Sequence, residues 1–322
     1  MRGIPWNAVE QNTPIKGTPY HAQDIAGEDK LCFWYQSMKT VDMDLPGAQD
    51  YYDSLIELYA SWGVDFLKID DMARGLSEEW HPKEIKGYRK AIEKTGRDIV
   101  YSLSPGPAHI SHTDFLCEHA HMIRISGDVW DDWTKYVLPQ FEQCATWAWY
   151  SGPGHWPDAD MLPLGKISIR SEAAYAHDLE PRYPRMTRDE QRAMVTLWAI
   201  FRSPLMLGGH LPENEEWTLS LISNKDVIYV NQSSRNNKQL FRYDEQVAWV
   251  ADAATADTTY VALFNLSDSV NQTVTVTWEQ LNINEPVQIK DLWTGEGLGV
   301  HRGEFGADLA PHAAGLYSFT SD

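Results

Sequence analysis

The sequence predicts an α/β fold in which a (β/α)8 TIM barrel is followed by an antiparallel β-sandwich. Up to residue 230, short apolar runs alternate with segments of helical periodicity, which is typical of a parallel sheet connected by helices. From residue 238 on, short runs of alternating apolar and polar residues lie between turn residues, and no helical period is found. We therefore predict two domains, a barrel over 1–232 and a sandwich over 233–322.

The elements of the barrel follow one another in order. Residues 1–48 are rich in Gly, Pro and polar residues and are expected to be irregular, apart from an apolar stretch at 31–35. Helices are predicted where apolar residues recur at helical spacing, at 48–62, 85–96, 133–144 and 187–201. The last of these begins with a capping box formed by Thr187 and Glu190. Barrel strands are expected at 64–69, 99–103, 121–125 and 203–209.

The sandwich is predicted from strands that are separated by turn residues. They are expected at 239–243, 247–251, 260–264, 273–278, 287–292 and 315–319. This domain is expected to be structural, with a lectin role as the second interpretation.

Composition excludes several classes of protein. The chain has 322 residues, of which 43% are hydrophobic and 23% charged, so it can bury a sizeable core and is not disordered. A net charge of −19 argues against nucleic acid and anionic membranes as partners. No apolar run approaches the length of a membrane span, and no signal peptide is recognisable. The 14 Trp and 15 Tyr indicate either core packing or sugar stacking, and composition does not separate the two.

Cysteines and histidines give no clear metal or disulfide signature. Cys32, Cys117 and Cys144 are spaced too irregularly for a zinc site, and they predict either one bridge with a free thiol or three buried thiols. The histidines 109, 112, 119 and 121 have spacings that can bind metal, as in metal-dependent hydrolases built on barrels. His119 and His121, however, are expected on the strand face opposite to Arg124. We therefore expect no metal and no other cofactor.

Carboxylates follow the ends of two predicted strands. Asp70 comes directly after the run at 64–69, and Asp128 follows the run at 121–125. Retaining glycosidases use two carboxyl groups, about 5–5.5 Å apart, one as nucleophile and one as acid and base. Because carboxylates at the ends of successive barrel strands meet at one rim of the barrel, Asp70 and Asp128 are candidates for this pair.

Four further residues are candidates for binding a sugar. Lys68 lies two residues before Asp70, so its side chain leaves the same face of the strand and could bind hydroxyls. Arg124 could bind a hydroxyl or orient an acid, and Asp160 could accept hydrogen bonds from sugar hydroxyls. Trp156 could stack on the sugar ring.

Each of these residues also has a purely structural interpretation. An Asp after a strand is often a helix cap or a turn residue, and we favour this for Asp71 and for Asp158. Arg124 could form an ion pair with Asp128 or Asp131. Several such residues at successive strand ends indicate a catalytic site more specifically than any one of them does.

At these residues the chain resembles glycoside hydrolase family 27, the α-galactosidase and α-N-acetylgalactosaminidase family. Residues 62–70 resemble the strand that carries its nucleophile, and 124–128 resemble its acid/base segment. Residues 152–162 are similar to a further signature of the family, 197–205 to its final helix and strand, and 225–232 to its link into the C-terminal sandwich.

The resemblance implies a retaining, metal-independent exo-glycosidase with a carbohydrate substrate. It implies that Asp70 is the nucleophile and Asp128 the acid/base, and that Lys68, Arg124 and Asp160 bind the sugar. We therefore expect hydrolysis of terminal α-galactosides. A carbohydrate-binding fragment without activity is the alternative from another class. The acidic surface and the family suggest a location outside the cytoplasm.

Two departures from the family pattern leave the substrate open. The loop after the strand at 99–103 has the small residues Ser104 and Ala108, as in the N-acetylgalactosaminidase branch, but lacks the Trp that the family normally has there. α-N-acetylgalactosaminidase, β-L-arabinopyranosidase and isomaltose-releasing activities of the family therefore stay open. The first two strands of the family have no counterpart, and residues 1–5 resemble the end of its third strand. We expect an N-terminally incomplete barrel with about five of the eight strands.

Overall fold

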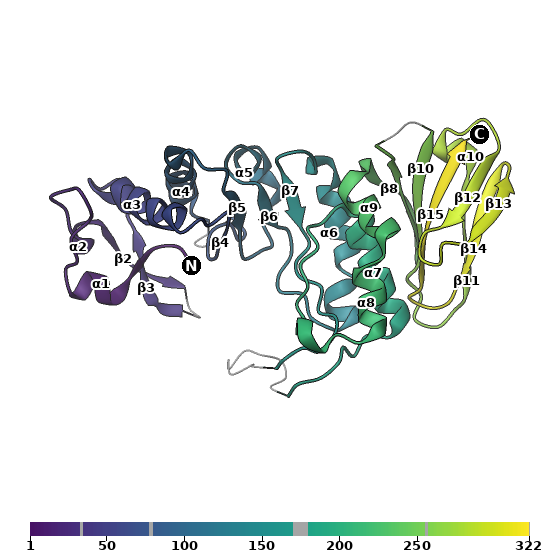
Figure 1. Cartoon of the computed structure of the whole chain (residues 1–322), viewed down its shortest axis with the longest axis horizontal. Helices are drawn as coiled ribbons and strands as arrows, with labels where there is room; N and C mark the ends of the chain where they lie inside the picture. Colours follow the sequence, from purple (N-terminus) through teal and green to yellow (C-terminus); the bar gives the residue numbers. More distant parts are fainter. Residues whose placement is uncertain (33–34, 77–79, 170–179, 255–256, 322) are drawn as a thin grey trace. The chain divides into compact units, whose positions relative to one another are not determined.

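The computed structural model describes residues 1–32, 35–76, 80–169, 180–254 and 257–321, and the chain forms two compact units. Unit 1 comprises Met1–Gly127 and Pro153–Asp158, and unit 2 comprises Asp128–Gly152 and Ala159–Asp322. Figure 1 shows the elements of both in colours that follow the chain. Among the helices of the described residues, none combines the length and the apolarity that crossing a bilayer would require.

The centre of unit 1 is a four-stranded parallel sheet in the order β4-β5-β6-β7. Its strands are β4 (Phe66–Ile69), β5 (Val100–Leu103), β6 (Met122–Arg124) and β7 (Trp156–Asp158). Helix α3 (Ala48–Ser61) precedes β4, α4 (Pro82–Thr95) connects β4 to β5, and a 3-10 turn η1 (Ile110–His112) and α5 (Thr113–His119) lie between β5 and β6. α3 buries Tyr52 and Ile56, and α4 ends at Gly96 in the left-handed region with φ 69°. The predicted alternation of parallel strands and helices is confirmed.

The N-terminal stretch differs from the prediction. It contains a three-stranded antiparallel sheet and two short helices: β1 (Ile4–Pro5), α1 (Trp6–Glu10), α2 (Ala22–Ile25), β2 (Ala26–Cys32) and β3 (Tyr35–Val41). The prediction of an irregular stretch over 1–48 is therefore wrong. Strand β2 begins with Ala, Gly, Glu, Asp and Lys, so it has no apolar alternation that the sequence could reveal. Phe33 and Trp34 of the apolar stretch lie outside the described residues.

The helices of unit 2 include the long helix α7, which contacts α9 and strands of the sandwich. These helices are a π-helical turn η2 (Trp133–Val137), α6 (Gln140–Trp147), η3 (Ala148–Tyr150), α7 (Arg188–Phe201), η4 (Leu211–Glu213), α8 (Glu216–Ile222) and α9 (Lys225–Ser233). The predicted capping box is confirmed, because Thr187 accepts from the Glu190 amide and its own amide donates to the Glu190 carboxylate.

The segment 203–209 is not the strand that we predicted. It forms one parallel bridge between Leu162 and Leu207, in which the Leu162 amide donates to the Met206 carbonyl at 2.8 Å. Pro204 has no amide hydrogen to donate. A side chain at Gly209 would come 1.9 Å from the Leu164 carbonyl oxygen, so the chain is packed tightly here without continuing the ladder. The parallel sheet therefore has four strands within the described residues.

The C-terminal part of unit 2 is the predicted antiparallel sandwich. A six-stranded sheet in the order β13-β12-β15-β10-β9-β8 lies with a two-stranded sheet β11-β14. The strands are β8 (Arg235–Tyr243), β9 (Gln246–Asp252), β10 (Thr258–Asn265), β11 (Gln272–Thr277), β12 (Val287–Asp291), β13 (Gly297–His301), β14 (Glu304–Leu309) and β15 (Ala314–Ser321). Apolar side chains from both sheets form its core, among them Leu263, Val276 and Phe319.

Two strands and one helix of the sandwich were not predicted. Strands β13 and β14 contain Gly297, Gly299 and Gly306, which interrupt the apolar alternation. The one-turn helix α10 (Trp278–Leu281) is too short to show a helical period. Helix α9 ends at Ser233 and β8 begins at Arg235, while the domain boundary at 232 stays a prediction.

Candidate active site

The parallel sheet brings the predicted site residues of unit 1 to one face. In register, Lys68 pairs with Ser102, Ser102 with Met122, and Met122 with Trp156. Successive side chains of a strand alternate between its faces, so a second row two residues further on shares this face. The second row contains Asp70, Ser104, Arg124 and Asp158, and Arg124 and Asp158 are partners in register. Two rows of mostly polar side chains therefore lie at the carboxyl ends of four neighbouring strands.

Lys68 contacts a carboxylate of another strand. Its Nζ lies 3.6 Å from Oδ2 of Asp158, which is buried at the end of β7, while a third of the Lys68 side chain stays exposed. Asp158 thus ends strand β7 in contact with a cation, and its interpretation as a turn-capping residue stays a prediction. Its position two residues after Trp156 puts both side chains on one face, and this spacing was the signal that the sequence offered.

The neighbouring carboxylates Asp70 and Asp71 have different environments. Asp71 is 1% exposed and has a left-handed backbone with φ 64°. Its Oδ2 lies 3.1 Å from Nε of Arg2, and its carbonyl accepts from the same Nε at 2.7 Å. Arg2 also pairs with Glu84, and burial raises the pKa of that carboxyl although Arg2 opposes this. Asp71 is thus held in a buried ion pair, and its role as a cap or turn residue stays a prediction. Asp70, in contrast, is partly exposed at the end of β4.

Backbone contacts hold the loop after β5 in place. The Ser104 carbonyl accepts from the Met72 amide at 3.0 Å, and the Ala108 amide donates to the Arg124 carbonyl at 3.0 Å. A Cβ atom at Gly106 would lie 2.2 Å from the Ser126 carbonyl oxygen. The loop is therefore fixed between the chain after β4 and the end of β6, and Ser104 is buried within it.

In unit 2, Asp128 is exposed, and it directly precedes Val129, whose amide is bound by Asp160. Asp160 is 5% exposed and has φ 84°, and its Oδ2 accepts from the Val129 amide at 2.7 Å. Its carbonyl accepts from Nε1 of Trp198 at 2.8 Å. One carboxylate oxygen of Asp160 therefore positions the segment that carries Asp128. A direct contact of Asp160 with a sugar, and the pairing of Asp70 in unit 1 with Asp128 in unit 2, stay predictions.

Asp131 has cationic and amide partners in unit 2. Its Oδ1 lies 2.6 Å from Nη2 of Arg182, and its Oδ2 accepts from the Arg185 amide at 3.0 Å. The ion pair of Arg124 with Asp128 or Asp131 stays a prediction.

The histidines have partners other than a metal. His121 Nδ1 accepts from the Tyr101 amide at 2.9 Å, and burial together with Arg89 lowers the pKa of this imidazole. His119 ends helix α5 and stacks on Phe115, so the prediction that it shares a strand face with His121 is wrong. His112 stacks on Trp80. No group of three or more His, Cys, Asp and Glu residues in the described part of the chain could hold a metal ion.

The two cysteines whose side chains are described have free thiols. Cys117 is exposed and Cys144 is buried, and burial raises the pKa of both. The side chain of Cys32 lies outside the described residues.

A parallel sheet of the barrel type with polar side chains at its strand ends, followed by an antiparallel sandwich, is the architecture of a class of barrel proteins that includes glycoside hydrolases. The model of the α-galactosidase A family matches residues 17–179, and that of the α-galactosidase C-terminal β-sandwich domain matches residues 243–319. The chain belongs to glycoside hydrolase family 27.

Three relatives show how similar the chain is to known members. A GH27 β-L-arabinopyranosidase from Geobacillus stearothermophilus is 46% identical with a TM-score of 0.95, over all of this chain and 72% of that one. A candidate α-N-acetylgalactosaminidase from Bacillus halodurans is 41% identical with a TM-score of 0.87, over all of this chain and 74% of that one. α-Galactosidase 2 of Arabidopsis thaliana is 28% identical over 87% of this chain. The chain spans 66% of that plant enzyme's length, slightly less than two thirds.

Proposed function

We propose that this chain supplies the catalytic residues of a retaining exo-glycosidase that removes terminal β-L-arabinopyranosyl groups. The identity of 46% with a β-L-arabinopyranosidase supports this substrate. α-Galactosides are the second candidate, because curated α-galactosidases are 27–29% identical to the chain. The two sugars have the same ring stereochemistry and differ by the hydroxymethyl group on C5 of galactose.

The proposal rests on the row of side chains at the carboxyl ends of β4 to β7. Asp70, Ser104, Arg124 and Asp158 share one face of four adjacent strands. Lys68, held by Asp158, and Arg124 supply hydrogen-bond donors for sugar hydroxyls on this face. A site with a carboxylate among donors of this kind suits a pyranose ring whose anomeric carbon faces Asp70.

The proposed reaction proceeds by double displacement. The Asp70 carboxylate attacks the anomeric carbon and forms a glycosyl-enzyme while Asp128 protonates the departing oxygen. Asp128 then takes a proton from a water molecule, which attacks the same carbon and releases Asp70. Two inversions at one carbon leave the anomeric configuration unchanged.

Hydrolysis of four p-nitrophenyl glycosides by the folded chain tests the proposal. The panel contains the β-L-arabinopyranoside, the α-galactoside, the α-N-acetylgalactosaminide and the α-glucoside, with Asp70→Asn as control. We expect the highest kcat/KM on the arabinopyranoside, loss of this activity in the control, and a first product of retained configuration in NMR spectra. Binding of arabinose in calorimetry without turnover of any of the four would instead support a carbohydrate-binding protein without activity.

A further inference from the structure

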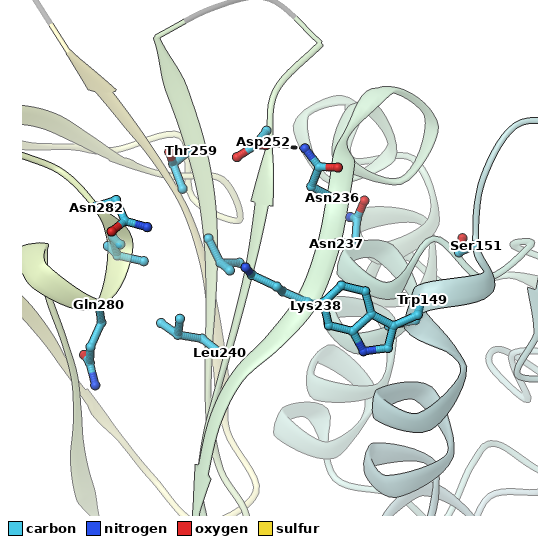
Figure 2. A pocket seen from close by; sticks show the side chains of 13 residues that line it. Trp149, Ser151, Asn236, Asn237, Lys238, Leu240, Asp252, Thr259, Gln280 and Asn282 are labelled. Carbon is cyan, nitrogen blue, oxygen red and sulfur yellow. Dashed lines mark hydrogen bonds between the residues drawn. The ribbon is translucent and has the colours of Figure 1, made fainter.

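A groove crosses one end of the sandwich in unit 2. Its first part has a volume of about 450 Å³ and is lined by the segment after α6, by β8 and β9, and by the end of helix α10. A second cavity of about 400 Å³ shares Asp252, Thr259, Leu281 and Asn282 with the first, so the two are continuous. Figure 2 shows Trp149 on one side of β8 and Gln280 and Asn282 on the other. The groove thus passes across β8, the edge strand of the sheet.

Trp149 is an exposed aromatic side chain in the first part of this groove. It lies on η3 with 79% of its surface exposed, the largest value among the large apolar side chains of the described residues. An indole that is exposed to water offers a flat apolar face, and the C–H groups on one face of a pyranose are suited to stacking on it. Neither the parallel sheet nor the proposed reaction uses this side chain.

Polar side chains beside Trp149 are held in place by hydrogen bonds. The side-chain amide Nδ2 of Asn236 donates to Oδ2 of Asp252 at 2.6 Å. The side-chain amide Nδ2 of Asn237 donates to the Ile200 carbonyl at 2.6 Å and to Oγ of Ser234 at 2.7 Å. These contacts reduce the rotamer freedom that a ligand would otherwise have to remove on binding.

The lining determines the class of ligand. Amide and carboxylate groups from Asn236, Asp252 and Asn282 combine donors and acceptors, as neighbouring sugar hydroxyls require. This polar lining does not suit an apolar ligand. Lys238 lines the first part, but Asp252 lines it as well, Asp257 and Glu285 line the second cavity, and the chain has a net charge of −19, so phosphate or uronate groups are disfavoured.

We propose that this groove is a second, non-catalytic site that binds a chain of neutral sugar units. Two continuous cavities fit several linked residues better than one monosaccharide. The site would hold the polysaccharide whose terminal sugars the enzyme removes. The identity of the bound polysaccharide as the substrate rests on the proposed function, whereas the binding of neutral sugar units in the groove does not.

Affinity electrophoresis of the whole chain tests the site. Native gels contain neutral arabinogalactan, galactomannan or, as the acidic comparison, polygalacturonate, and all samples have the Asp70→Asn background so that the polymer is not consumed. We expect at least one neutral polysaccharide to retard the chain, and Trp149→Ala to weaken this binding by about fivefold to tenfold. The matched control is Trp62→Ala, a Trp with 67% of its surface exposed outside the groove, which should leave retardation unchanged.

The outcomes separate this inference from the proposed activity. Equal retardation of the Trp149→Ala variant and its parent, or no retardation by either neutral polymer, would overturn the second site. In the active background, Trp149→Ala should hydrolyse the p-nitrophenyl substrate at the parental rate. If Trp149 is required for retardation but the chain hydrolyses none of the four glycosides, the binding site in the groove would be supported and the proposed reaction would be contradicted.

Discussion

The parallel sheet of unit 1 and the six-stranded sheet of unit 2 use their faces in opposite ways. Strands β4 to β7 are three or four residues long, and one face holds Lys68, Asp70, Arg124 and Asp158. The strands of the sandwich sheet have five to nine residues and bury apolar side chains such as Leu263. Burying a charged group gains no hydrophobic free energy, so this face of the parallel sheet stabilises the fold less than the apolar core of the sandwich does. Substitutions on the two sheets should therefore affect different properties.

The largest effect is expected from Asp70→Asn. Because the amide cannot form the glycosyl-enzyme, kcat/KM should fall by about ten-thousandfold or more, with little change in stability. Kinetics on the preferred p-nitrophenyl glycoside, with circular dichroism as the check of folding, measure both. A well-folded variant with a parental rate would exclude Asp70 as nucleophile.

Asp128→Asn should have a smaller effect that depends on the substrate. Loss of acid/base assistance reduces rates by about a hundredfold to ten-thousandfold, most for leaving groups that need protonation. Azide, which attacks the glycosyl-enzyme without a base, should restore part of the activity and give a glycosyl azide. Equal losses on good and poor leaving groups, together with no azide product, would rule out this role.

In the sandwich, Leu263→Ala tests whether substitutions in the apolar core affect stability and leave activity unchanged. Leu263 is fully buried in the apolar core, so its truncation should lower the free energy of unfolding by about 3 kcal/mol. Urea titration measures this loss. The kcat of the molecules that remain folded should be unchanged, and a change comparable to that of Asp128→Asn would contradict the division between the two sheets.

Asp71→Asn should show that a carboxylate beside the proposed nucleophile can be structural. It removes one of the two buried partners of Arg2, while Glu84 remains. We expect the free energy of unfolding to fall by about 2 kcal/mol, less than for a buried cation left with no partner. Urea titration of Asp70→Asn and Asp71→Asn side by side measures this difference. A lower urea midpoint for Asp70→Asn than for Asp71→Asn would contradict the prediction.

The smallest effect concerns the pH dependence of unit 1. Burial, with a contribution from Arg2, lowers the pKa of His81 from 6.5 to about 3. Between these values the unfolded chain binds a proton that the folded chain does not, so this contribution to stability is complete above pH 6.5 and declines towards pH 3. His81→Gln should reduce the loss of stability between pH 7 and pH 5.5 by about 1 kcal/mol. Parallel urea titrations that show the same loss in both proteins would contradict the assignment.

Much of the fold could be predicted because its elements have local signals. The capping box at Thr187 and Glu190 and the apolar runs before Asp70 and Asp128 indicated where helices and strands lie. Strand β2 gave no such signal, because backbone pairing with β3 forms it and its side chains do not alternate. Segment 203–209 looked like a strand, but Pro204 and the close packing of Gly209 limit it to one bridge.

The candidate site was predictable along each strand but not between strands. Lys68 and Asp70 could be placed on one face by their spacing of two residues. The contact of Lys68 with Asp158 depends on which strands are neighbours and on their register, and no local pattern encodes this. For the same reason the bond from the Val129 amide to Asp160 could not be foreseen.

The close approach at Gly106 has a consequence for directed evolution of this loop. Its missing side chain is what allows the loop to lie against the carbonyl of Ser126, since a Cβ atom there would meet backbone and not a movable side chain. A combinatorial library that seeks a different sugar preference should therefore randomise Ser104, Pro105 and Ala108 and keep Gly106 constant. A side chain at position 106 would displace the whole loop, and such variants should be lost for lack of activity, whatever their sugar preference.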